Sequence, residues 1–202
     1  MIADKASGQT KSVHAHRRRA YGQLVWSLLI VVVCAGSLAI LSCGGGDDDD
    51  DTEPLGGNLT GAQEVPPTSS SATGTVTLNI SEDGTRIDFT LNVSTTLATN
   101  IREAHIHIAP IGSNGPIVLD FCTTNLVTPP ANVPLPPTCP TAPFTLTGTL
   151  TAANLRPITP QIQEAGVNNF GDAVAQINNG NAYANVHTVA FPSGEIRAQI
   201  IQ

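Results

Sequence analysis

Residues 74–93 read GTVTLNISEDGTRIDFTLNV, and this stretch decides the fold. Apolar and polar residues alternate in 74–80 and again in 86–93, which predicts two strands that each present one apolar face. The Asp83-Gly84 pair between the two runs is a strong signal for a tight hairpin turn. The stretch therefore predicts an antiparallel β-hairpin with one buried face.

Most of the remaining chain shows the same two-residue period, and Thr, Val and Ile are frequent in it, as is typical of strands. Turn residues separate the alternating runs at fairly regular spacing. Further strands are expected at 57–62, 102–108, 117–121, 144–150, 182–189 and 195–201. The pattern predicts an all-β fold, an antiparallel β-sandwich of about seven or eight strands.

One segment departs from this period and predicts a short helix near 169–179. Its apolar residues are spaced as on one helix face: Val167, Phe170, Val174 and Ile177. Asn168 or Asn169 is a suitable N-cap, and Gly180 stands where a helix would end. We expect this helix to pack over one end of the sheets.

The first 42 residues are predicted to be an export signal rather than part of the fold. A basic start with Arg17-Arg18-Arg19 precedes an apolar run from Leu24 to Leu41. The following Ile40-Leu41-Ser42-Cys43 resembles a bacterial lipobox, which implies that Cys43 is lipidated after cleavage; Cys34 is a poorer candidate. The apolar run is nearly long enough to span a bilayer, so a retained membrane anchor is the alternative.

Residues 43–56 are predicted to form a flexible acidic tether, which leaves 57–202 as one domain. Glycines at 44–46 and aspartates at 47–51 bury no apolar surface and repel one another. We therefore expect an exported protein held in the cell envelope by its lipid. Gly44 after the cysteine is compatible with the outer membrane or the cell surface, and a periplasmic orientation is the alternative.

The charge balance excludes nucleic acid as a partner. The chain has a formal net charge of -7, and lysine is absent after residue 43. The only cationic side chains there are Arg86, Arg102, Arg156 and Arg197. Nucleic-acid binding requires clustered Lys and Arg.

Two cysteines remain after the predicted cleavage, and they are predicted to form a disulfide. Cys122 and Cys139 are an even pair in an exported chain. The segment between them is rich in Thr, Asn and Pro, which indicates a long surface loop. A metal site made of cysteines alone would need more than two thiolates.

The strands 102–108 and 182–189 carry the candidate site. Because side chains alternate, Glu103, His105 and His107 share one strand face, and Asn185 and His187 share one face of the other strand. Glu195 and Arg197 follow on the last strand. If these strands are neighbours, three imidazoles and two carboxylates lie on one sheet surface.

Three motifs together resemble the CHRD domain. They are Leu59-Thr60-Gly61-Ala62-Gln63-Glu64-Val65-Pro66-Pro67, then Glu103-Ala104-His105-Ile106-His107 with Asn114-Gly115-Pro116-Ile117-Val118, and finally Gly180–Thr188 with Pro192–Gln199. This family takes its name from chordin, an extracellular antagonist of bone morphogenetic proteins, and also occurs in bacterial exported proteins. The resemblance implies an extracytoplasmic β-rich module and no established reaction.

Two functions remain in competition. The first is a non-enzymatic module on a lipid tether that binds an unknown protein, glycan or matrix component, with structural histidines. The second is a mononuclear Zn or Cu site formed by His105, His107 and His187, with Glu103 or Glu195 orienting a ligand. Only three histidines lie after residue 43, too few for the dinuclear site of copper/zinc superoxide dismutases.

An enzyme is not predicted. The chain has no Gly-x-Ser-x-Gly nucleophile elbow. A glycosidase would need a pair of carboxylates, for which Glu103 and Glu195 are the candidates. We expect no catalytic residue and no required cofactor other than Zn or Cu.

Overall fold

The computed structural model describes residues 54–128 and 130–202. The predicted signal peptide, Cys43 and most of the predicted tether lie outside these residues. Within the described ranges no helix is both long and apolar enough to cross a membrane.

The predicted all-β architecture is confirmed. Eight strands alternate with turns along the chain: β1 (Leu55–Thr60), β2 (Thr73–Ile80), β3 (Arg86–Val93), β4 (Ile101–Ile108), β5 (Ile117–Thr123), β6 (Phe144–Thr151), β7 (Ala182–Thr188) and β8 (Ile196–Ile200). The predicted β2–β3 hairpin forms, with Ile80 opposite Ile87 beside the turn. Strand β1 begins at Leu55, so it includes the last two residues of the predicted tether.

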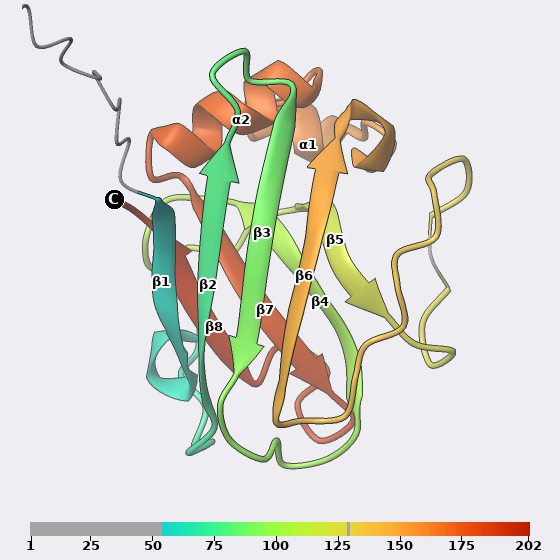
Figure 1. Cartoon of the computed structure of the whole chain (residues 1–202). Coiled ribbons are helices and arrows are strands. Elements are labelled where there is room, and N and C mark those ends of the chain that lie inside the picture. Colours follow the sequence, from blue (N-terminus) through green and yellow to red (C-terminus); the bar gives the residue numbers. More distant parts are fainter. Residues whose placement is uncertain (1–53, 129) are drawn as a thin grey trace, which may run out of the picture. The chain divides into compact units, whose positions relative to one another are not determined.

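All eight strands belong to one antiparallel sheet that curls until it is nearly closed. The strand order is β5-β4-β7-β8-β1-β2-β3-β6. Figure 1 shows β2, β3 and β6 in front of β8, β7 and β4, which form the second layer. Phe89 on β3 and Phe121 on β5 meet across the interior with ring centroids 4.7 Å apart, so strands from opposite ends of the sheet face each other. The two layers predicted from the sequence are thus two halves of one continuous sheet.

The core fills the space between these layers. It consists of the apolar residue of each alternating pair, for example Leu91 on β3, Ile106 on β4 and Val186 on β7, all fully buried. The same alternation directs the polar residues of β4 and β7 to the outer face of the sheet. Core and candidate site therefore lie on opposite faces of the same two strands.

Two helices lie at one end of the sheet (Figure 1). The predicted helix is α2 (Phe170–Asn178), and the Asn169 side chain accepts a hydrogen bond from the backbone of Asp172 at 3.0 Å. Gly180 follows with a positive φ of 71°. The shorter α1 (Pro160–Glu164) was not predicted, because five residues are too few to show a helical period. The 3-10 turns are η1 (Gly61–Gln63) and η2 (Ala152–Asn154).

The predicted disulfide joins Cys122 and Cys139 and fastens the loop between β5 and β6, the two edge strands. Cys139 N donates to the Thr123 carbonyl at 3.0 Å, so the end of the loop pairs with β5. Residues 134–137 line a cavity of about 210 Å³ together with residues of β5 and β6. The disulfide loop therefore covers the opening between the edge strands.

Replacing both cysteines by alanine should lower the free energy of unfolding by roughly 3 kcal/mol, because the bridge closes a loop with a sequence separation of 17. Chemical denaturation of the purified chain would measure this. Leu135→Ala is the control, since that side chain is 78% exposed in the same loop and should change stability little. A loss below about 1 kcal/mol in the double variant would contradict the role given to the bridge.

Candidate metal centre

The register between β4 and β7 brings the predicted histidines together. Glu103 stands opposite His187, His105 opposite Asn185, and His107 opposite Tyr183. The next strand continues the row, with Arg197 of β8 opposite Asn185. The three strands β4, β7 and β8 are therefore neighbours in the sheet, as the candidate site requires.

Loops cover this polar surface and bury it. Asn114 Nδ2 donates to the Val65 carbonyl at 2.7 Å, which joins the segment after β4 to the segment after β1. Arg197 reaches the same cover by donating to the Ser113 carbonyl at 2.8 Å. As a result His105 is 0% exposed, and His107 and His187 are 8% and 7% exposed. The site is an enclosed polar layer rather than a solvated sheet face.

The three imidazoles converge. One potential ligand nitrogen from each of His105, His107 and His187 lies within 4.8 Å of the other two. The ring of His105 is central, with its centroid 4.5 Å from that of His187 and 4.8 Å from that of His107. Such a group of buried nitrogen donors is a candidate ligand set for one metal ion.

Backbone carbonyls orient two of the rings. His107 Nδ1 lies 2.7 Å from the Gly115 oxygen, and His187 Nδ1 lies 3.0 Å from the Pro192 oxygen. A carbonyl only accepts, so each Nδ1 must carry the proton and donate. Each Nε2 then holds a lone pair, and both Nε2 atoms are buried without a hydrogen-bond partner among the described residues. Metal-binding histidines are oriented in this way.

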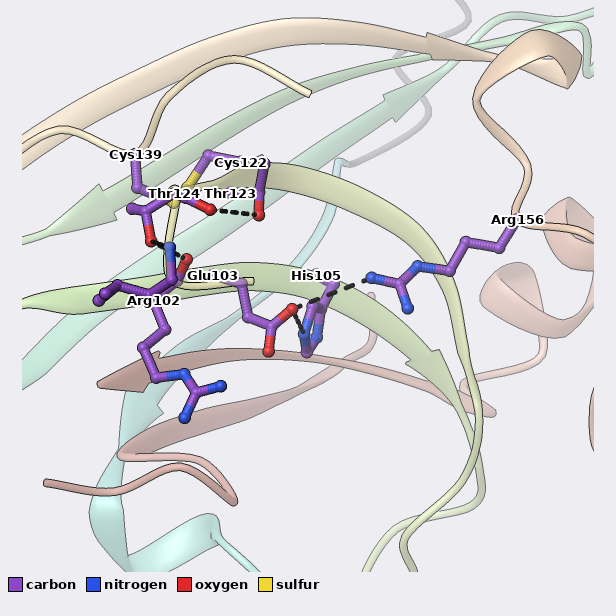
Figure 2. Close-up of a disulfide and its surroundings, with 9 residues drawn as sticks. Arg102, Glu103, His105, Cys122, Thr123, Thr124, Cys139 and Arg156 are labelled. Carbon is purple, nitrogen blue, oxygen red and sulfur yellow. Dashed lines mark hydrogen bonds and ion pairs between the residues drawn. A yellow bond between two sulfur atoms is a disulfide. The ribbon is translucent and has the colours of Figure 1, made fainter. Parts of the chain in front are cut away.

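The third ring, His105, lies beside a carboxylate. Glu103 Oε2 is 3.4 Å from His105 Nε2, and Arg156 Nη2 is 4.0 Å from the same oxygen (Figure 2). Arg156 also forks onto Asp120, with Nε donating to Oδ2 at 2.9 Å. Two carboxylates, Glu103 and Asp120, therefore share the Arg156 guanidinium beside His105. The predicted orienting role of Glu103 fits this geometry.

Burial keeps the imidazoles neutral. Desolvation lowers the pKa of His105 and His107 well below the usual range, and charge repulsion within the group adds to the effect. Desolvation likewise lowers the pKa of His187, against the raising effects of the Pro192 carbonyl and of Glu103. Neutral imidazole is the form that binds metal.

Unpartnered polar atoms are concentrated in this cluster. Within the described residues seven buried side-chain nitrogen or oxygen atoms lack a hydrogen-bond partner, and one of them is Arg102 Nε. The other six are Glu64 Oε1, Asn185 Oδ1, His107 Nε2, His187 Nε2 and both ring nitrogens of His105. Because protein interiors normally pair such atoms, their accumulation in one place makes this cluster the candidate site.

Arg197 forms no ion pair with Glu103 or Glu195 within the described residues. Its guanidinium carbon lies 3.4 Å from the Tyr183 ring centroid, and that ring stacks on His107 with an interplanar angle of 5°. Strand β7 separates Arg197 from Glu103. The Arg197 guanidinium is instead stabilised by the Tyr183 ring and by the Ser113 carbonyl. Through the Tyr183 ring it is linked to His107.

Glu195 is also placed differently from the other predicted residues. Both of its carboxylate oxygens are engaged, one by Ser70 Oγ and Ala98 N and the other by Thr188 Oγ1, at 2.7–2.8 Å. Its carboxylate joins the segments after β1, β3 and β7. Among the described residues it has no contact that would orient a histidine, which leaves Glu103 as the candidate for that role.

Glu64 belongs to the site and was missed in the sequence. Its carboxyl lies beside the Asn185 amide, and burial raises its pKa to about 7, against the opposing effects of Arg197 and of the Asn185 hydrogen bond. Any residue other than glycine at position 194 would collide with this carboxyl, since a Cβ there would lie 2.5 Å from Oε1. Its loop position, outside any periodic strand, gave no signal that it would face the histidines.

A cleft of about 1020 Å³ lies on the far side of the loop 109–116. Residues of this loop form one wall, and Pro157, Ile162 and Gln176 are among those that line the rest. The same loop carries Gly115, whose carbonyl orients His107. Cleft and histidine cluster therefore share a wall.

The fold defines an all-β domain built from one nearly closed antiparallel sheet. Residues 55–200 match the model of the CHRD domain, and the chain belongs to the CHRD family. No curated protein and no solved structure matches the chain.

Glu64→Gln should change how stability depends on pH. Because the folded state raises the Glu64 pKa from 4.5 to about 7, it holds a proton that the unfolded chain releases, so this group destabilises the fold as pH rises through that window. The variant should gain stability relative to the parent at pH 8, by at most about 3 kcal/mol, and not at pH 4.

Denaturant unfolding of the metal-free chain at both pH values measures this difference. The difference between parent and variant isolates Glu64 from the histidines, whose lowered pKa values act in the opposite direction. An equal effect of Glu64→Gln at pH 4 and pH 8 would contradict the buried-carboxyl explanation.

Proposed function

We propose that this CHRD domain is a non-enzymatic module that binds one Zn²⁺ or Cu²⁺ ion through His105, His107 and His187. The observation that carries the proposal is the convergence of three buried, neutral imidazoles whose facing nitrogens have no other partner. Three imidazole ligands suit both ions.

The spacing is compatible with one ion after a small closure. Zn–N bonds of about 2.0–2.1 Å in a tetrahedral site place ligand nitrogens about 3.3 Å apart. The nitrogens here lie within 4.8 Å of one another. Rotations of the rings about their side-chain bonds bring them to the shorter distance while the Nδ1 hydrogen bonds of His107 and His187 act as pivots.

The competing explanation is that the histidines only stabilise the sheet. A structural histidine in a buried layer would have both ring nitrogens paired, as an unpaired buried polar atom costs about 1–3 kcal/mol. His105 has neither nitrogen in a hydrogen bond, and the Nε2 atoms of His107 and His187 are in the same state. A bound cation would engage one nitrogen of each ring at once, and the remaining nitrogen of His105, Nε2, lies 3.4 Å from Glu103 Oε2.

We further propose that the chain is exported and attached to the membrane by a lipid on Cys43. The support is the basic and apolar leader, the lipobox-like Ile40–Cys43 and the acidic run after it. The disulfide between Cys122 and Cys139 is consistent with an oxidising compartment. The metal ion would then be taken from outside the cytoplasm.

Metal analysis of the full chain, purified in detergent and dialysed against Zn²⁺ or Cu²⁺, should give one ion per chain. His105→Ala, His107→Ala and His187→Ala should each lower the affinity at least tenfold, because a three-ligand set loses a donor. Titration with a competing chelator measures the affinity.

Glu195→Gln is the matched control, since it changes a buried polar side chain next to β7 without removing a donor from the cluster. It should bind metal like the parent chain even if it is less stable. Stoichiometric metal that persists in all three histidine variants, or no metal in the parent, would refute the site.

Cys43→Ala should move the full chain from the membrane fraction to the soluble fraction or leave an uncleaved precursor. The physical reason is that lipid attachment supplies the apolar contact that holds the chain on the bilayer. Cell fractionation and lipid labelling report the outcome, with Cys34→Ala as the control. Lipid labelling that persists in Cys43→Ala would contradict the anchor.

A further inference from the structure

The centre of the histidine cluster contains a fourth potential donor, Asn185. It stands opposite His105 on β4 and opposite Arg197 on β8. In β7 it precedes His187 by two residues, so both side chains leave the same face of the strand. Asn185 is 3% exposed, and its carbonyl oxygen Oδ1 has no hydrogen-bond partner among the described residues.

The surroundings decide which way this amide faces. The Glu64 carboxyl lies on one side of the amide, and Asn185 lowers the Glu64 pKa in the way that a hydrogen-bond donor does. Only the Nδ2 end of the amide can donate, so that end faces Glu64. Oδ1 then faces away from Glu64, beside His105, which stands opposite Asn185 in the pairing of β4 with β7.

A ring nitrogen of His105 that donated a hydrogen bond to Asn185 would carry a proton. It would then have no lone pair to offer a metal ion. His105 Nε2 lies 3.4 Å from Glu103 Oε2, so this nitrogen is the one to carry the proton. Nδ1 of His105 is then the metal ligand and has no proton to donate to Asn185. The amide oxygen and one nitrogen of each imidazole are then buried and unpartnered among the described residues.

We propose that Asn185 Oδ1 is the fourth ligand of the metal ion bound by the three histidines, with Glu64 holding the amide in place; this inference rests on the proposed metal site. The site is then a closed set of three nitrogens and one oxygen, without a coordinated water. Closed four-ligand sets are the structural type of zinc site, whereas catalytic sites keep an open position. The ion then has a structural role, because its ligands come from both β4 and β7 and it holds these two strands together.

The test is electron paramagnetic resonance of the full chain, loaded with one Cu²⁺ in water enriched in ¹⁷O. A coordinated water broadens the copper lines through the ¹⁷O nucleus, and an amide oxygen from the protein does not. We expect no broadening in the parent chain, broadening in Asn185→Ala, and none in Asn185→Asp, which keeps an oxygen donor. Asn185→Ala should also bind Cu²⁺ at least tenfold more weakly.

Three further variants separate coordination by Asn185 from solvent access through the covering loop, and they test the positioning role of Glu64. Asn114→Ala removes contacts of the covering loop but no proposed ligand, so it should show no broadening. Glu64→Leu removes the acceptor for the amide and should show broadening, while Glu64→Gln keeps an acceptor oxygen and should behave like the parent.

Broadening in the parent chain, or its absence in Asn185→Ala, would overturn the proposal for Asn185 and leave the three-histidine site intact. Equal broadening in Glu64→Gln and Glu64→Leu would overturn the role of Glu64. Failure of the proposed function has a different signature, namely a parent chain that binds no stoichiometric Cu²⁺ or whose spectrum lacks nitrogen hyperfine structure.

Discussion

The pairing of β4 with β7 is the constraint on which the site depends. The antiparallel register sets His187 beside Glu103 and Asn185 beside His105, and it therefore decides which polar side chains meet. A shift by one residue would turn the histidines of β4 into the core and bring Ile106 to the outer face. The buried apolar residues of both strands prevent that shift, so the core stabilises the geometry of the site.

The outer face of these strands is unusual because it is polar and also buried. Loops after β1, β4 and β7 close over it. Each supplies a backbone carbonyl that accepts a hydrogen bond: Val65 from Asn114, Gly115 from His107, and Pro192 from His187. Such a cover concentrates unpartnered polar atoms in a medium of low dielectric constant, which destabilises the fold unless a ligand engages them. A bound metal ion would engage these unpartnered atoms and so offset the free-energy cost of burying them.

Family membership and the histidine cluster answer different questions. The CHRD match covers residues 55–200 and establishes an extracellular-type β domain, but no reaction follows from it. The cluster is a property of particular side chains, and its chemistry follows from their geometry. A metal that joins two neighbouring strands would also strengthen a domain that has few charged residues and, among its described residues, one disulfide.

Much of the fold could be predicted because its signals are local. Alternation in β2 and β3, the Asp-Gly turn and the cap at Asn169 are features of neighbouring residues, and all of them reappear in the structure. The prediction that His105, His107 and His187 share a surface also succeeded, since strand alternation orients each side chain once the strands are adjacent. The short α1 gave no comparable signal.

The sequence by itself determined the strands, the face of each histidine and the disulfide partners, because a two-residue period and an even cysteine count are properties of the chain. Only the tertiary structure decided that this face is buried, that Glu64 joins it, and that Glu195 and Arg197 support other contacts. These outcomes depend on how distant loops fold over the sheet. The energy of a polar side chain is set by the neighbours that replace water around it, and those neighbours are remote in sequence.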